Sequence, residues 1–234
     1  MSIRRVARVE ARIVPHRWEW AERNAEAVAA NFARRKAVAP AIFDGPVLMV
    51  SFLRDGTDRL EADFFTTGYA RLIAHLDGGC RDPSVRNGFA MGALRSADGA
   101  FLLGEMAPHT AHAGQLYFPA GTPDPTDVRP GGTVDLEGSI RREVGEETGI
   151  ELGAEDLAPG WIVVEADGRL AFIKEIGLAD AAETIRLRAR AHFAAEDRSE
   201  LSDLVAVRGP EDIRPDRMPL FLQEFLRDAF AAQG

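Results

Sequence analysis

A short charged run near the middle of the chain places the strongest constraint on its fold. Residues 142–150 read Arg-Glu-Val-Gly-Glu-Glu-Thr-Gly-Ile, so that Glu143, Glu146 and Glu147 stand at relative positions i, i+3 and i+4. On a helix of about 3.6 residues per turn these three side chains share one face. Like charges this close repel one another, and hard carboxylate oxygens suit Mg²⁺ or Mn²⁺. The spacing therefore predicts a divalent-metal site on a helix, of the kind that handles phosphate groups.

The residues around this run help to distinguish a metal site from an ordinary solvated helix. Glu-rich helical segments are usually solvated faces, and their ion pairs stabilise a helix by only roughly a few tenths of a kcal/mol. Here Ile140 and Val144 give the helix an apolar opposite face, and Gly149 is a typical helix stop. An apolar strand and a Pro-x-Gly turn, Phe118-Pro119-Ala120-Gly121, precede the run. This setting favours the metal site.

The turn and the run together resemble the box of the Nudix family. The second half of that signature reads Arg-Glu-apolar-x-Glu-Glu-x-Gly-apolar, and residues 142–150 meet every fixed position of it. The first half departs from the pattern, because the Gly and the Glu that the family carries there fall on Val128 and Val134. The resemblance therefore indicates a variant box whose metal ligands are intact.

Residues 122–133 are interpreted as a loop inserted between the turn and a shortened helix start. The segment contains three prolines and the pair Gly131-Gly132, which favour turns. We therefore predict that Ala120-Gly121, and not Gly131-Gly132, faces the glutamates. Asp124 and Asp127 in the loop could meet a metal or sugar hydroxyls, but acids beside prolines more often shape turns.

The resemblance implies an α/β fold, the Nudix α-β-α sandwich with a mixed sheet, for residues 86–234. Residues 1–85 are then an N-terminal α+β extension. Apolar periodicity and turn residues predict strands and helices in both parts. In the extension we expect strands at 6–14, 47–52 and 60–66 and helices at 18–36 and 69–76. In the larger part we expect paired strands at 89–94 and 100–106 and at 161–165 and 170–176, helices at 179–194 and 219–231, and a strand at 203–207.

For activity, the resemblance implies hydrolysis of a diphosphate bond in a nucleoside diphosphate linked to another moiety, with Mg²⁺ (or Mn²⁺) as cofactor. It implies metal ligands from Glu143, Glu146 and Glu147 and from the backbone carbonyl of Ala120. ADP-ribose and UDP-sugars lead the substrate candidates, and residues 40–46 faintly resemble Nudix proteins that cleave UDP-sugars. The alternative is a catalytically weak Nudix-fold protein that binds a nucleotide as a sensor, which the altered first half of the box keeps open.

The resemblance also implies a general base, either on the metal-binding helix or on a later loop. Glu146 is the candidate on the helix, and Glu196 and Glu200 are the candidates on the loop before the strand at 203–207. Either loop acid taken singly can be a solvated side chain. The sequence therefore leaves the choice among the three open.

Arg142 is the remaining residue with an expected catalytic part, since in the family it holds the metal-binding glutamates through a carboxylate partner. Val134 stands where that partner would be. A buried guanidinium without an acceptor would be costly, so another acid must take its place. We expect Asp135, because a carboxylate at a helix N-terminus is also favoured by the helix dipole. Glu137 and Glu146 are the further candidates.

Aromatic and histidine side chains near the turn are candidates for other binding roles. Tyr117 and Phe118 could stack on a nucleobase as substrate-binding residues, although aromatic residues in strands are more often core. His109 and His112 have a spacing that could bind metal. Without further ligands such histidines are more often polar loop residues, so a zinc site is the weaker interpretation.

Composition limits the partners. A net charge of −9 disfavours a nucleic-acid polymer but leaves room for a small nucleotide conjugate whose charge a metal neutralises. The best apolar run, residues 46–53, is far shorter than the roughly 20 residues of a membrane-spanning helix, so we expect no membrane partner. The single Cys80 excludes an intramolecular disulfide, and the N-terminus lacks the apolar stretch of a signal peptide, so we expect a cytoplasmic location. Pairing of two copies into a homodimer is left open.

Overall fold

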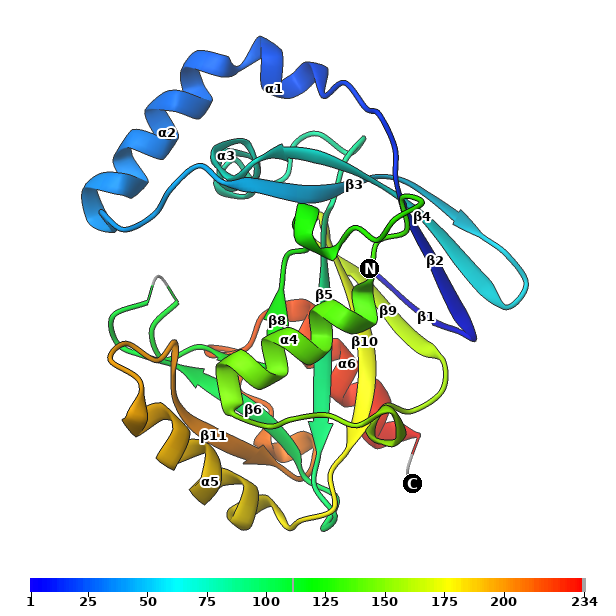
Figure 1. Ribbon diagram of the computed structural model, residues 1–234, viewed down its shortest axis with the longest axis vertical. Coiled ribbons are helices and arrows are strands. Elements are labelled where there is room, and N and C mark those ends of the chain that lie inside the picture. The colour runs from blue at the N-terminus through cyan, green and yellow to red at the C-terminus, as the bar shows by residue number, and fades with distance from the viewer. Residues whose placement is uncertain (111, 233–234) are drawn as a thin grey trace.

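Two β-sheets, one large and one small, organise the chain (Figure 1). The structure is a computed structural model that describes residues 1–110 and 112–232. In the large, eight-stranded sheet β10 and β5 run parallel, and the other neighbours are antiparallel. Its strands in spatial order are β1 (Ser2–Val6), β9 (Trp161–Ala166), β10 (Arg169–Gly177), β5 (Asn87–Arg95), β6 (Phe101–Met106) and β11 (Leu201–Val207), with the short β7 (Leu116–Tyr117) beside β6 and β8 (Ala120–Gly121) beside β5.

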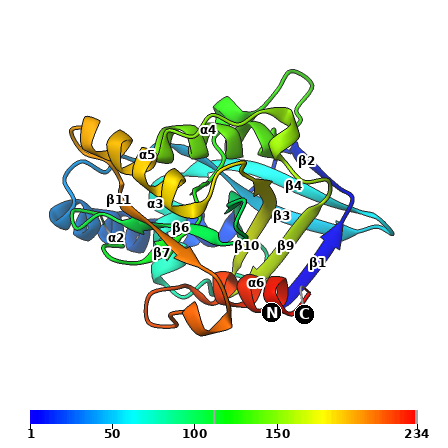
Figure 2. The same cartoon turned by 90° about the horizontal axis from the view of Figure 1, so that it is seen from below.

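Helices cover both faces of the large sheet (Figure 2). α4 (Leu136–Thr148) and α5 (Ala182–Ala195) pack on one face, and α6 (Leu220–Ala231) covers the other. The contact between α4 and the sheet is close, since a Cβ on Gly92 of β5 would lie 2.9 Å from Val144 Cγ2. The α-β-α sandwich with a mixed sheet that the sequence predicts is therefore confirmed.

The small sheet belongs to the first third of the chain. Its central strand pairs in parallel with one neighbour and antiparallel with the other. The strands, in spatial order, are β2 (Arg8–Ile13), β4 (Arg59–Gly68) and β3 (Pro46–Asp55). The helices of this part are α1 (Glu19–Arg23), α2 (Ala25–Val38) and α3 (Tyr69–Asp77), seen at the top of Figure 1. The expected α+β extension is confirmed, while its boundary between residues 85 and 86 stays a prediction.

The first residues of the extension do not form the single strand expected at 6–14. The chain bends at Ala7, whose N–H donates to the Asp58 carbonyl at 2.7 Å, and so forms β1 and β2 on either side. β1 leaves the extension and pairs with β9, beginning with Ser2 opposite Glu165. The extension therefore contributes an edge strand to the large sheet.

Asn24 divides the helix expected at 18–36 into α1 and α2. Its side-chain amide donates a hydrogen bond to the Trp20 carbonyl at 2.7 Å. A side chain that bonds to nearby backbone carbonyls offers the chain an alternative to a continuous helix. The apolar spacing of the segment does not reveal this competition.

The two expected hairpins differ in how far their strands stay paired. β9 and β10 are joined by Asp167-Gly168, where φ is 50° and 71°, as a tight hairpin turn requires. β5 and β6 pair only at Arg95 opposite Phe101 and then separate. β7 and β8 lie beside the separated strands, which places Ala120-Gly121 in the sheet next to α4.

Short 3-10 helices complete the described elements. They are η1 (Pro125–Asp127), η2 (Ala154–Asp156) and η3 (Pro210–Asp212). Across residues 1–110 and 112–232, no helix combines the length and the apolar character that crossing a membrane requires.

Candidate active site

Helix α4 begins and ends at residues that suit helix termini. Asp135 is its N-cap and accepts a hydrogen bond from the Gly138 N–H at 3.0 Å. Gly149 ends it with a φ of 71°, in the left-handed region that favours glycine. Ile140 and Val144 are fully buried against the sheet. The predicted helix stop and apolar face are therefore confirmed.

The Ala120-Gly121 turn lies directly against the glutamate face of α4. A Cβ on Gly121 would stand 2.1 Å from Oε1 of Glu143, so any larger residue there would displace the Glu143 carboxylate. The Ala120 N–H donates a hydrogen bond to the carboxylate of Glu147. Gly132 instead lies beside β2 of the extension, where its carbonyl accepts a hydrogen bond from the Ile13 N–H at 2.8 Å. The predicted placement of the two glycine-containing segments is confirmed.

Glu147 is the most strongly perturbed of the three glutamates. Burial raises the pKa of Glu147 well above its ordinary value, and the charges of Glu143 and Glu200 raise it further. The hydrogen bond from Ala120 opposes this shift by favouring the charged form. A partly buried carboxylate among other acids lacks compensating positive charge, and a bound cation would supply it.

The donors at this site suit a hard divalent ion, although they do not converge on one point. Within the described part of the chain, no group of three or more His, Cys, Asp or Glu side chains could hold a metal ion as it stands. The Glu143 side chain is 16% exposed and bonded to Arg142, whereas that of Glu146 is 63% exposed. Carboxylate and carbonyl oxygens are the preferred ligands of Mg²⁺. The residues therefore fit the ion in chemistry, and their side chains would have to turn toward one another to bind it.

Arg142 finds its carboxylate partner in the loop that precedes the helix. Its guanidinium donates to both carboxylate oxygens of Asp127, each at 3.3 Å, and to Glu143 at 2.7 Å. A weaker contact to Glu146 spans 3.4 Å. The Asp127 side chain is only 6% exposed, so this ion pair is partly withdrawn from water.

The prediction that Asp135 braces Arg142 is wrong. As the N-cap of α4, Asp135 directs its carboxylate at the start of the helix, and it also pairs with Arg129. Glu137 is occupied by Lys174, at 2.9 Å. Of the candidates taken from the sequence, Glu146 alone touches Arg142. Sequence reasoning missed Asp127 as a partner because it considered only acids close to Arg142 along the chain.

The two candidate loop acids lie in different surroundings. Glu200 is close enough for its charge to raise the pKa of Glu147, though less than burial and Glu143 do. Its backbone carbonyl accepts from the Ala107 N–H at 2.8 Å, which fixes the chain there. Glu196 instead pairs with His192, at 3.4 Å. Of the two, Glu200 is the one whose charge influences Glu147, whereas Glu196 is connected to α4 only through His192, whose Nε2 lies 3.1 Å from the Glu146 carbonyl.

Phe118 is not available to stack on a base, which corrects the candidate role given to it. It is 1% exposed and packs edge-on against Phe101 and Phe225 in the core beneath α6. Its ring therefore has no free face. The alternative interpretation, that an aromatic residue in a strand is core, holds for Phe118.

Tyr117 is only partly buried and lies beside groups that the sequence did not bring together. Its ring is 5.9 Å from that of His112. Burial raises the pKa of Tyr117, and the charge of Arg169 partly offsets this. Burial and then the charges of Arg35 and Arg169 lower the pKa of His112. These side chains come from separate elements, so no local pattern predicts their proximity.

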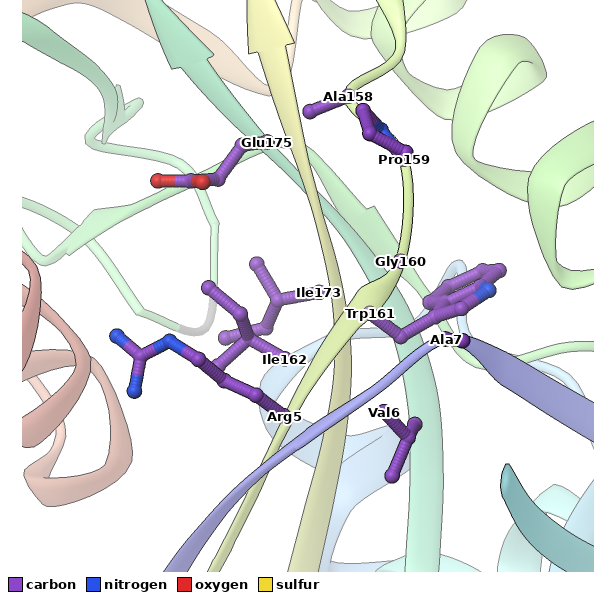
Figure 3. A pocket seen from close by; sticks show the side chains of 10 residues that line it. All are labelled: Arg5, Val6, Ala7, Ala158, Pro159, Gly160, Trp161, Ile162, Ile173 and Glu175. Carbon is purple, nitrogen blue, oxygen red and sulfur yellow. The ribbon is translucent and has the colours of Figure 1, made fainter. Parts of the chain in front are cut away.

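A separate cavity of about 370 Å³ lies along β1 and β9 (Figure 3). Its lining includes Arg5, Ile162, Ile173 and Glu175. None of the candidate site residues lines it.

No protein-family model and no curated protein matches the chain. Solved structures do match. The MutT protein from Methanosarcina mazei Go1 is 19% identical, with 63% of this chain and 94% of that chain covered and a TM-score of 0.40. The Nudix hydrolase RenU from M. smegmatis is 21% identical, with 64% and 88% covered and a TM-score of 0.39.

DR0079 from Deinococcus radiodurans is a third similar structure, 15% identical over 78% of this chain and 99% of that chain, with a TM-score of 0.43. A Nudix hydrolase is thus among the solved structures that this chain is similar to, as the box residues led us to expect. With these identities and TM-scores the likeness concerns the fold alone. The function proposed below rests on this chain's own side chains.

Proposed function

We propose that this chain hydrolyses a diphosphate bond in a nucleoside diphosphate linked to another moiety, with Mg²⁺ or Mn²⁺ as cofactor. The observation that carries the proposal is the crowding of Glu147 with Glu143 and Glu200 beside the Ala120-Gly121 turn. Carboxylates gathered in this way without a cation repel one another. Their arrangement therefore supports a site built for a divalent ion.

The chain's own residues divide the work of the proposed reaction. Glu143, Glu146 and Glu147 and the Ala120 carbonyl would hold the ion. Once bound, the ion would neutralise phosphate oxygens and make a bound water more acidic. Arg142 would keep Glu143 in place through the hydrogen bond described above.

A general base would take the proton of the attacking water as the phosphorus–oxygen bond of the anhydride breaks. Glu146 and Glu200 are both exposed and are the better supported candidates. Glu200 has the additional support that its charge acts on Glu147. Glu196 is the weaker candidate, because it already pairs with His192.

The substrate's nucleoside would bind near Tyr117. Its partly exposed ring, with the His112 ring 5.9 Å away, offers an aromatic surface for a base. Arg169 forms no hydrogen bond or ion pair with the side chain of another described residue. Its positive charge adds to the effect of burial in lowering the pKa of His112 and opposes the rise that burial causes in the pKa of Tyr117. A guanidinium that has no acidic partner can bind a phosphate group of the substrate. ADP-ribose and UDP-sugars therefore remain the leading substrates.

A nucleotide panel tests the proposal directly. Purified protein is incubated with ADP-ribose, UDP-sugars and nucleoside triphosphates, with Mg²⁺, with Mn²⁺ and with a chelator, and products are separated by chromatography. We expect one class of conjugate to be cleaved into two phosphomonoesters and the chelator to abolish cleavage. Cleavage that is unaffected by the chelator would contradict the metal-dependent mechanism.

A nucleotide-binding sensor of low activity is the second candidate. It is favoured by the arrangement of the side chains, since no group of three or more His, Cys, Asp or Glu side chains among the described residues is placed to hold a metal ion. Calorimetry with the same panel separates the two functions. Tight binding of a nucleotide that stays intact with either metal would support the sensor and overturn the hydrolase.

A further inference from the structure

The loop at residues 122–133 is held at both ends by the small sheet of the extension. At its start, the Leu48 N–H of β3 donates to the Pro123 carbonyl at 2.7 Å. At its end, the Ile13 N–H of β2 donates to the Gly132 carbonyl at 2.8 Å. The loop that follows the Ala120-Gly121 turn is therefore bonded to two strands from the first third of the chain.

The attachment to β2 continues into the start of the box helix. Arg12 and Thr133 form an antiparallel bridge, and the Val134 N–H donates to the Ala11 carbonyl at 3.0 Å. Val134 itself is 3% exposed and packs in the main core. The position that would carry the family's acid thus carries an apolar residue that joins the extension to the core.

Asp127 sits in the middle of this loop with little freedom. Its carboxylate accepts a hydrogen bond from the Asp124 N–H at 3.0 Å, within the short helix η1. Its backbone carbonyl accepts from the Asp135 N–H at 2.8 Å, which ties it to the start of α4. Both bonds fix the direction in which the buried carboxylate faces Arg142.

These contacts form a continuous path from the extension to the glutamates. β2 and β3 hold the loop, the loop holds Asp127, Asp127 holds Arg142, and Arg142 holds Glu143. Without Asp127, the guanidinium would be partly buried with only the box glutamates as acceptors. It would then compete with a metal ion for Glu143.

We propose that Asp127 is the positioning residue of the box glutamates and that the extension's small sheet is the platform that keeps it in place. The metal-binding consequence rests on the function proposed above, whereas the contact of Asp127 with Arg142 does not. Asp127 acts through Arg142 and touches neither metal nor substrate. The extension thereby takes part in the active site without lending it a ligand.

Asp127→Asn isolates the charge of this residue from its role in the loop. The asparagine side-chain oxygen can still accept from the Asp124 N–H, so η1 keeps its cap, but the negative charge opposite Arg142 is lost. Asp135→Asn is the matched control. It makes the same exchange at the N-terminus of α4, on an acid that does not touch Arg142.

Two readouts are measured in the intact chain without any nucleotide. The first is the dissociation constant for Mn²⁺ by calorimetry. We expect Asp127→Asn to weaken Mn²⁺ binding by about 10- to 100-fold, as loss of a group that orients a metal ligand does, and Asp135→Asn to change it little. Wild-type Mn²⁺ affinity in Asp127→Asn would overturn the proposal.

The second readout is the nuclear magnetic resonance signal of the Arg142 guanidinium, assigned with Arg142→Lys. Slow rotation of its terminal groups is expected in the wild type and in Asp135→Asn, and faster rotation in Asp127→Asn. Equal rotation in all three proteins would overturn the positioning role. This readout stands even if no nucleotide is cleaved and no ion binds, so failure of the proposed function is distinguishable from failure of this inference.

The platform is tested at the two loop glycines. Gly131 and Gly132 have φ values of 94° and 86°, so any other residue is strained at either position. An alanine Cβ at Gly132 would only reach ordinary contact with the extension, 3.4 Å from Ile13 Cγ2, so the larger valine is used, whose methyl groups would press on Ile13. At Gly131 nothing lies within 4 Å of a Cβ, so Gly131→Val is the control. We expect Gly132→Val to weaken Mn²⁺ binding several-fold more than Gly131→Val. Equal effects of the two exchanges would show that the extension does not keep Asp127 in place.

Discussion

The box helix and the loop that precedes it are specified in different ways. α4 has its N-cap, apolar face, glutamates and stop within residues 135–149, so its local sequence specifies it. The loop at residues 122–133 has its own turns but takes its place from β2 and β3 of the extension. The charged groups of the candidate site are therefore close together in sequence, whereas the loop that holds the partner of Arg142 depends on contacts with distant residues.

The largest effect is expected on the local side of this comparison. Glu143→Gln and Glu147→Gln each remove the charge of a proposed metal ligand and keep the shape of the side chain. We expect metal-dependent hydrolysis to fall by at least ~100-fold in each, because the ion loses a ligand. Thermal stability without metal should hold or rise, since repulsion around Glu147 is relieved.

Turnover and thermal unfolding are measured side by side for these variants. Glu151→Gln is the control, since it makes the same exchange on an exposed acid just beyond α4. Near wild-type turnover in both box variants would falsify the assignment of the site. A loss of folding in either variant would show that these acids stabilise the chain and would contradict a site strained by like charges.

A smaller effect is expected where the turn meets the helix. Gly121→Ala places a Cβ 2.1 Å from Oε1 of Glu143, so the carboxylate must move. We expect the rate of hydrolysis to fall by roughly tenfold, as for other displaced ligand geometries. Gly177→Ala, at the end of β10, is the control for the loss of a glycine, because its Cβ meets nothing within 4 Å and its φ is not positive. Equal activity in the two variants would show that the close approach of Gly121 to Glu143 does not matter for hydrolysis.

Most of the fold could be predicted because its elements carry local signals. The Asp167-Gly168 turn, the apolar face of α4 and its Gly149 stop all act within a few residues. The break at Asn24 and the separation of β5 from β6 were not predicted. The break at Asn24 depends on one side-chain hydrogen bond to the Trp20 carbonyl. The separation of β5 from β6 goes together with the pairing of the short strands β8 and β7 beside them.

The candidate site also contains residues that local sequence predicts and residues that it does not. Glu143, Glu146 and Glu147 follow from helical spacing, and their roles stay predictions. The partner of Arg142 could not be ranked correctly, because Asp127 lies fifteen positions away and reaches Arg142 only after the loop has folded against the extension. Arg169, for which we propose a role in nucleotide binding, has no local signal in the sequence, because its neighbours come from separate strands and loops.

Arg169→Gln extends the comparison to the substrate side of the site. Arg169 pairs with no side chain among residues 1–110 and 112–232, and removing its guanidinium should weaken nucleotide binding and leave the chemical step unchanged. We expect KM to rise by about tenfold with kcat preserved, the size of one charged hydrogen bond. Steady-state kinetics on the cleaved conjugate give both constants, and Arg81→Gln, at an exposed position, is the control. A fall in kcat with unchanged KM would place Arg169 outside nucleotide binding.

The smallest effect concerns the stability of the extension that holds the loop. His75 of α3 is fully buried and packs edge-on against the stacked pair Trp18 and Trp20, with ring centroids 5.4 and 5.5 Å away. Neither of its ring nitrogens has a hydrogen-bond partner among the described residues. Burial lowers the pKa of His75 below its ordinary value, and the charge of Asp82 opposes this only in part.

The sign of the resulting pH dependence follows from the lowered pKa. The unfolded chain binds a proton at His75 near pH ~6.5, while the folded chain does not. The contribution of His75 to the free energy of unfolding is therefore fully present above that value and is lost as the pH falls below it, by up to about 1.4 kcal/mol per pH unit, until the folded-state pKa is reached.

Urea unfolding of the wild type and of His75→Leu at about pH 7.5 and 5.5 measures this pH dependence, because the variant cannot take up the proton. His109→Gln, at an exposed position, should keep the wild-type dependence. An identical loss of stability at acid pH in His75→Leu would mean that another group destabilises the chain there, and that the buried ring is not the acid-sensitive point of the extension.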